Sequence, residues 1–126
     1  MGDNVERLRI EGLDRLEVRE VRRDLGGEVT FEEQQLTADK AGEPATIAAV
    51  VVLSAIAIKA LAQFMMKQRH RGRCQFRFER VRGEERFVTE VSIDDSSSTS
   101  SADVIKQLGS ALKLDQDLVM EALRPG

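Results

Sequence analysis

The most conspicuous pattern in the chain is an apolar run from Ala45 to Met66, interrupted by one charged residue, Lys59. Its length, its alanines and its lack of internal glycine or proline favour a helix, which we predict over about residues 45–68. Since the run is apolar on nearly every side, most of its faces should be covered. Lys59, Gln63 and Lys67 recur at every fourth position and predict one narrow polar stripe. This is typical of a central core helix that packs on a sheet and exposes one narrow edge of its own surface to solvent.

Three shorter elements precede this run. Apolar residues in the charged stretch 5–12 predict a first strand. Residues 13–25 carry apolar positions closer to helical than to strand spacing, and Gly26-Gly27 provides a helix stop. Residues 28–36 alternate around valine and phenylalanine and predict a second strand. A polar connector, residues 37–44, then leads into the apolar run.

Two further elements follow it. Residues 73–93 alternate with period two on both sides of a Gly-containing turn, which predicts a β-hairpin. A serine-rich loop then ends in a helix N-cap signal at Ser100 or Ser101. It leads into a C-terminal helix over about residues 101–123, whose second half either continues the first or forms a second short helix.

The predicted order is β-α-β-α-β-β-α. We therefore expect a single α+β domain over residues 1–126, with roughly four strands in one antiparallel or mixed sheet covered by helices. A chain of 126 residues has room for one such domain and a usable core.

Charge is distributed unevenly along the chain. Residues 1–44 carry twelve acids and seven bases, a balance of −5, and residues 59–90 carry nine bases and four acids, a balance of +5. Such surfaces can attract each other within one molecule or between copies. A single cysteine fits a reducing compartment, and no secretory signal is recognisable, so we expect a cytoplasmic protein.

The residues that carry chemistry are few. His70 and Cys74 are single and four apart, and we interpret them as a surface histidine and a sheet cysteine rather than a nucleophilic pair. The carboxylate doublets 32–33, 84–85 and 94–95 alternate faces on strands and turns, which does not suit an acid/base pair. No phosphate-loop, dinucleotide or metal-ligand pattern is present. We therefore expect that the protein is not an enzyme and that it binds no cofactor, metal ion or small-molecule substrate.

A basic cluster follows the apolar run. It is read either as a phosphate- or lipid-binding patch or as a solvated helix end that pairs with the acidic N-terminal third. The negative net charge of −3 favours the second interpretation and disfavours nucleic acid. As a candidate interaction surface we take six residues: Lys59, Gln63, Lys67, Arg69, Arg71 and Arg73.

The stretch AGEPATIAAVVVLSAIAIKALAQFMMKQRHRGR, followed directly by CQFRFERVRGEERFVTEVSI, resembles the effector-associated constant component proteins of bacterial conflict systems. The likeness lies in element order and composition and spans most of the chain. Relatives often carry Trp-Leu near the end of the apolar helix, where this chain has Phe64-Met65-Met66. The resemblance implies a non-catalytic accessory role beside an effector such as a protease.

The sequence thus predicts a non-enzymatic protein-interaction or adaptor module that binds an effector or itself. The alternative is a single-span membrane protein anchored by residues 44–66. The run upstream of Lys59 is shorter than the roughly 20 apolar residues that a bilayer core requires, and the ammonium would be costly inside it.

Overall fold

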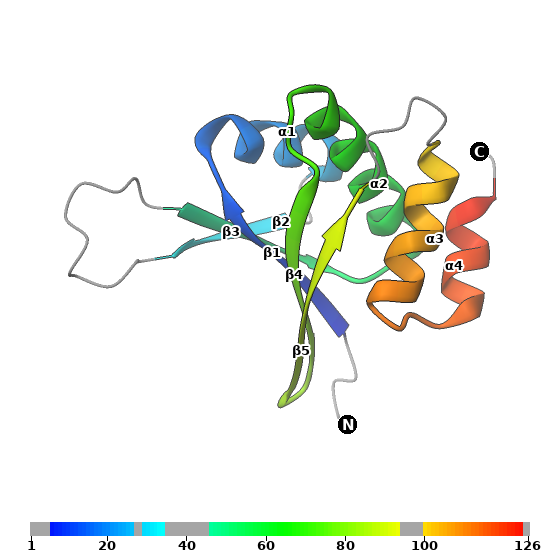
Figure 1. Cartoon of the computed structure of the whole chain (residues 1–126). Helices are drawn as coiled ribbons and strands as arrows, with labels where there is room; N and C mark the ends of the chain where they lie inside the picture. The colour runs from blue at the N-terminus through cyan, green and yellow to red at the C-terminus, as the bar shows by residue number, and fades with distance from the viewer. Residues whose placement is uncertain (1–5, 27–28, 35–45, 94–99, 125–126) are drawn as a thin grey trace.

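The computed structural model describes residues 6–26, 29–34, 46–93 and 100–124 and shows an α+β fold (Figure 1). The strands are β1 (Glu6–Leu13), β2 (Val29–Gln34), β3 (Thr46–Val52), β4 (Gln75–Arg82) and β5 (Glu85–Ser92). The helices are α1 (Arg15–Leu25), α2 (Ala55–His70), α3 (Ser101–Ala111) and α4 (Gln116–Leu123). The five described strands form one antiparallel sheet in the order β2-β3-β1-β4-β5. The predicted fold class is confirmed, but four strands and the order β-α-β-α-β-β-α are wrong.

The error lies in the apolar run. The helix predicted over residues 45–68 is instead strand β3 followed by helix α2. Residues 46–52 are rich in β-branched side chains, which suit a strand, and β3 lies between β2 and β1 near the middle of the sheet. Ser54 then begins the helix, because its side chain accepts a hydrogen bond from the backbone N–H of Ala57 at 3.1 Å.

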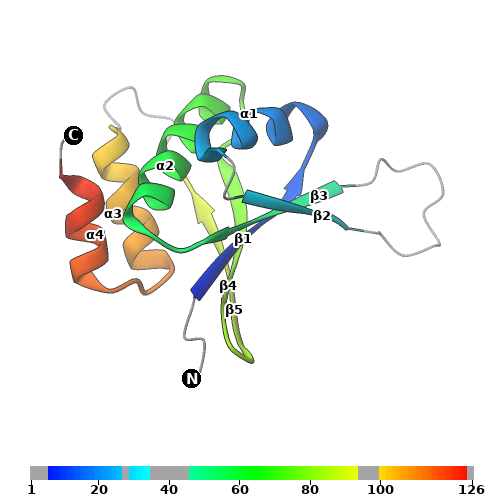
Figure 2. The same cartoon turned by 180° about the vertical axis from the view of Figure 1, so that it is seen from behind.

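One face of the sheet carries the core. In β1, Leu8 and Ile10 are fully buried, while Arg7, which precedes Leu8, is exposed. Strand β4 alternates in the same way and buries Phe76 and Phe78. The helices lie against this face (Figures 1 and 2). Phe64 of α2 meets Phe76 edge-on, with 6.2 Å between ring centroids, and so joins the helical layer to the sheet.

A bulge near the end of β1 turns the chain toward the helices. The register shifts between Ile10 and Leu13, and Gly12 adopts a φ of 73°, which glycine accepts without strain. Both Ile10 and Leu13 are therefore buried although they are three residues apart. Asp14 caps α1 immediately afterwards in a reciprocal capping box with Glu17.

Of the two alternatives for the C-terminal helix over about residues 101–123, the structure shows the second, because the segment is broken into α3 and α4. The break is a tight turn in which Lys113 has a φ of 53° and the N–H of Leu114 bonds to the carbonyl of Gly109. Ser100 caps α3 as its sequence predicts. Its backbone N–H donates to the carboxylate of Asp103, and its hydroxyl adds a second bond, so the pKa of Asp103 is lowered.

Close packing of α3 on α4 depends on Gly109. A Cβ built there would lie 2.6 Å from Cγ2 of Val119. We expect Gly109→Ala to destabilise the protein by about 1–3 kcal/mol through overpacking, which exceeds the gain of about 1 kcal/mol in helix propensity. Urea unfolding of this variant, and of Gly109→Ala combined with Val119→Ala, measures the effect. The second substitution should recover most of the loss, and a single variant as stable as the wild type would contradict the contact.

Candidate protein interface

The predicted interaction residues do not form one free patch. Lys67, Arg71 and Arg73 face the carboxylates of α1 and form ion pairs there. Their N–O distances are 2.9 Å to Asp24, 2.5 Å to Glu20 and 2.5 Å to Glu17, in that order. This is the pairing between the basic cluster and the acidic N-terminal third that the charge distribution suggested.

The other three predicted residues lie in different surroundings. Arg69 is buried, with 8% of its surface exposed. Lys59 points to the C-terminal end of α4, where its Nζ donates to the carbonyl of Arg124 at 2.7 Å. Gln63 is exposed on α2. The structure therefore brings Lys67, Arg71 and Arg73 together, but it uses them to attach α1 to α2 and to the start of β4.

Arg73 has the most contacts in this group. Besides the ion pair with Glu17, its guanidinium donates to the carbonyls of Gly12 and Gln75 and lies 5.2 Å from the ring centroid of Phe76. The Glu17 side chain is only 5% exposed and also accepts from the N–H of Asp14. A buried carboxylate is thus neutralised by an arginine 56 residues further along the chain.

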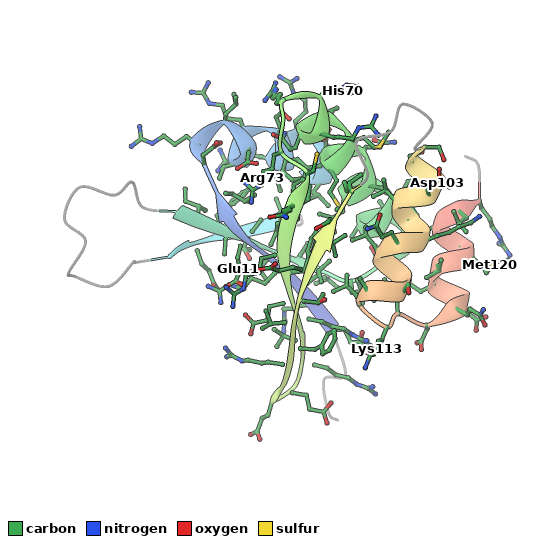
Figure 3. The ribbon with its side chains drawn as sticks, in the orientation of Figure 1. Glu11, His70, Arg73, Asp103, Lys113 and Met120 are labelled. Carbon is green, nitrogen blue, oxygen red and sulfur yellow. The ribbon has the colours of Figure 1, made fainter. Side chains whose placement is uncertain are left out.

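The candidate chemical groups do not converge on a reaction centre. His70 is exposed at the end of α2 (Figure 3), and Cys74, a free thiol, is half-buried before β4. No hydrogen bond joins these two side chains within the described ranges. There, too, no group of three or more His, Cys, Asp or Glu side chains is placed to hold a metal ion. The carboxylate doublet at residues 94–95 lies outside the described part of the chain.

The face of the sheet without helices carries a charged ladder. Arg9 lies between Glu32 and Glu79, at 3.4 and 3.5 Å, and Arg86 reaches Glu79 at 3.4 Å. The ion pair between Arg9 and Glu32 spans β3, where Arg9 is paired with Val50 and Glu32 with the fully buried Ala48. These charges satisfy one another within the chain, so the ladder stabilises the sheet surface and leaves little unpaired charge for a ligand.

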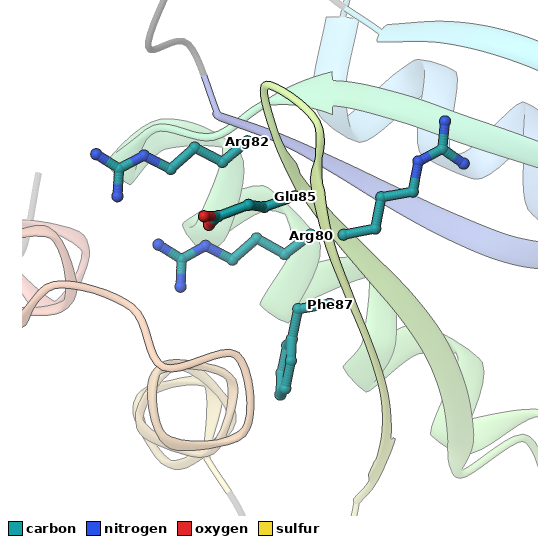
Figure 4. Close-up of a pocket in the computed structure, with 5 residues that line it drawn as sticks. Arg80, Arg82, Glu85 and Phe87 are labelled. Carbon is teal, nitrogen blue, oxygen red and sulfur yellow. The ribbon is translucent and has the colours of Figure 1, made fainter.

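A hollow of about 480 Å³ lies at the far end of the hairpin, lined by three arginines, a glutamate and a phenylalanine (Figure 4): Arg80, Arg82, Glu85, Arg86 and Phe87. Arg80 is fully engaged. It forms two bonds to Glu6 at 2.9 and 3.0 Å and donates to the carbonyls of Leu112 and Lys113, both at 2.8 Å. The hollow therefore joins the hairpin to the turn between α3 and α4 rather than forming a free anion site.

A second hollow, of about 580 Å³, has a different character and is called here the acidic hollow. Its apolar floor consists of Val52, Leu53 and Leu118. Carboxylates surround the floor: Asp115, Asp117, Glu121 and Glu6. Glu6 pairs with Arg80 and with Arg82, which also lines the hollow, so three carboxylates have no ion-pair partner within the described residues.

Exposed apolar side chains lie within three residues, along the sequence, of positions that line the acidic hollow. Ile56, on the first turn of α2, is 82% exposed, and Val52, at the end of β3, is 42% exposed. Ile56 lies between Leu53, which lines the hollow, and Lys59, which contacts α4. Met120, 62% exposed, is on α4 on the side of the molecule away from α1 (Figure 3). Water thus reaches three apolar side chains that belong to, or lie near in sequence, the residues lining the acidic hollow.

Sequence reasoning missed this surface. Ile56 belongs to the same apolar run as the buried Ile58, and no local pattern separates the two. The acidic residues 115, 117 and 121 fall within the predicted C-terminal helix, and the sequence pattern assigns them no function. The one available signal was that Asp117 and Glu121 are four residues apart and so share a helix face.

Comparisons with protein-family models, curated proteins and solved structures find no match to this chain. None of the helices in the described ranges combines the length and the apolar character that crossing a bilayer requires.

Proposed function

We propose that the chain is a non-enzymatic protein-interaction or adaptor module whose partner binds at the acidic hollow. The observation that carries this proposal is the lining of the hollow, where Val52, Leu53 and Leu118 accompany three carboxylates that have no ion-pair partner among the described residues. Ile56 and Met120 are exposed and lie within three residues of lining positions in the sequence. Leaving apolar area in water forfeits about 25 cal/mol per Å² of burial energy. Exposed apolar side chains accompanied by polar ones are typical of sites that another protein covers.

The surroundings of the hollow define the chemistry of the partner. An apolar floor accepts an aliphatic or aromatic anchor, and fully desolvated anchors of this kind supply most of the binding energy in interfaces. The unpaired carboxylates Asp115, Asp117 and Glu121 favour a partner segment with lysine or arginine beside that anchor. The proposed partner segment is therefore basic and amphipathic.

The resemblance described above adds a proposal for the partner's identity. It favours an effector of a bacterial conflict system, such as a protease, with this chain as the accessory component. The contacts of the basic cluster also support a structural assignment for those residues, since Lys67, Arg71 and Arg73 serve intramolecular ion pairs. The acidic hollow replaces them as the proposed binding surface.

The test uses purified proteins encoded beside this gene, with binding measured by isothermal titration calorimetry. We expect Ile56→Ala combined with Met120→Ala to weaken the complex at least about tenfold, as for truncated interface anchors. Val88→Ala, an apolar residue 47% exposed elsewhere, is the matched control and should bind normally. A strictly monomeric protein that binds none of these partners would refute the proposal, as would a complex indifferent to the double substitution.

A further inference from the structure

Helix α1 presents a second exposed surface of opposite charge. Arg15, Leu16, Arg19, Arg22 and Arg23 are all exposed. At about 100° per residue they fall within an arc of about 120°. None of these arginines forms an ion pair with a described residue, and Leu16 is 51% exposed at one edge of the arc. We call these five residues the basic face of α1.

The basic face is separate from the acidic positions of the same helix. Glu17, Glu20 and Asp24 lie on another side of α1, where Arg73, Arg71 and Lys67 neutralise them. The helix therefore uses its carboxylates inside the molecule and leaves its guanidinium groups toward solvent. Arg22 is partly engaged, with its guanidinium 5.1 Å from the ring centroid of Phe31.

The basic face and the acidic hollow cannot meet within one molecule. Helix α1 lies at one end of the helical layer and α4 at the other, with α2 between them, in both views (Figures 1 and 2). Two complementary surfaces at opposite ends of a chain form a head-to-tail contact, which extends into a ring or a filament rather than closing as a two-fold dimer.

We propose that the basic face of α1 of one copy binds the acidic hollow of the next. This inference rests on the proposed function, because it names a second copy of the chain as one occupant of the same surface. Leu16 supplies an apolar anchor for the floor of Val52, Leu53 and Leu118. The arginines beside it on α1 match the unpaired carboxylates that line the hollow, so opposite charges meet next to the apolar contact.

The test compares the two halves of the contact by analytical ultracentrifugation at up to about 100 µM protein, a range that reveals weak electrostatic contacts. The first variant, Leu16→Ala/Arg19→Ala/Arg23→Ala, removes the basic face and keeps the hollow. The second, Asp117→Ala/Glu121→Ala, removes the rim and keeps the basic face. The control Glu84→Ala/Glu90→Ala removes the same charge from exposed hairpin positions. Circular dichroism checks that all variants fold.

We expect the wild type and the control to form assemblies that grow with concentration and weaken with salt. Each interface variant alone should be monomeric. An equimolar mixture of the two should form a pair and nothing larger, because each chain brings one intact surface. A monomeric wild type, assemblies that persist in either variant, or a mixture that stays monomeric would each overturn the inference. A monomeric wild type that still binds an effector in an Ile56-dependent way would refute only the head-to-tail contact, and the proposed function would stand.

Discussion

Replacing Ile58 by Asp is expected to unfold the protein in aqueous buffer. Ile58 is fully buried in α2 and belongs to the core between the helical layer and the sheet. An aspartate there would place a carboxylate among apolar side chains without an ion-pair partner. Substitutions that bury such a charge are among the costliest, and lower the free energy of unfolding by more than about 4 kcal/mol. The total free energy of unfolding of a domain is only about 5–15 kcal/mol.

Ile56→Asp is the matched control two residues earlier. Ile56 is 82% exposed and lies on the first turn of α2, which carries no acidic residue. A carboxylate at a helix N-terminus interacts favourably with the helix dipole, by about 0.3–1 kcal/mol, so this variant should melt at or slightly above the wild-type temperature. Thermal melts followed by circular dichroism compare the two. Near-native stability of Ile58→Asp would contradict the core position of α2.

Replacing Arg73 by Ala is expected to cause the second large loss, up to about 3–5 kcal/mol, because the buried Glu17 carboxylate loses its partner, an arginine whose side chain is 30% exposed. The Glu17 carboxylate, 5% exposed, would keep its charge and lose the guanidinium 2.5 Å away. The carbonyl of Gly12 would lose its donor as well. Urea unfolding gives the free-energy difference.

Arg77→Ala is the control for this experiment, because the Arg77 side chain is 60% exposed, twice as much as that of Arg73, and its partner Glu11 is 18% exposed against 5% for Glu17. A surface pair is worth about 0–1 kcal/mol. The double variant Arg73→Ala/Glu17→Gln should be more stable than Arg73→Ala alone, since no unpaired charge stays buried. If Arg73→Ala lowers the free energy of unfolding by no more than Arg77→Ala does, the ion pair between Arg73 and Glu17 contributes no more to stability than the pair between Arg77 and Glu11.

The elements that the sequence predicted well depend on local rules. Helix α1 begins at a capping box, Asp14 with Glu17, and ends at Gly26, whose φ of 71° is a glycine conformation. The hairpin of β4 and β5 follows from alternation around Gly83, and its strands lie within the predicted range 73–93. In each case the deciding residues are close in sequence, so no knowledge of distant partners is needed.

The apolar run shows where local rules fail. Composition alone favoured one helix, although the β-branched residues 50–52 and the capping residue Ser54 marked a boundary. What makes β3 a strand is its position between β2 and β1, where backbone hydrogen bonds form on both sides. The gain from that pairing comes from residues 12 to 45 positions away and outweighs helix propensity.

By itself, the sequence determined the α+β class, the charge asymmetry and the identity of the basic cluster, because these follow from composition and short-range pattern. The tertiary structure decided how each charge is used. It turned Lys67, Arg71 and Arg73 inward to α1 and left Asp117 and Glu121 without ion-pair partners among the described residues. It also buried Ile58 and exposed Ile56, two residues of one kind on one helix. Burial depends on which distant element covers a side chain, and only the packing of α2 against the sheet and α4 supplies that information.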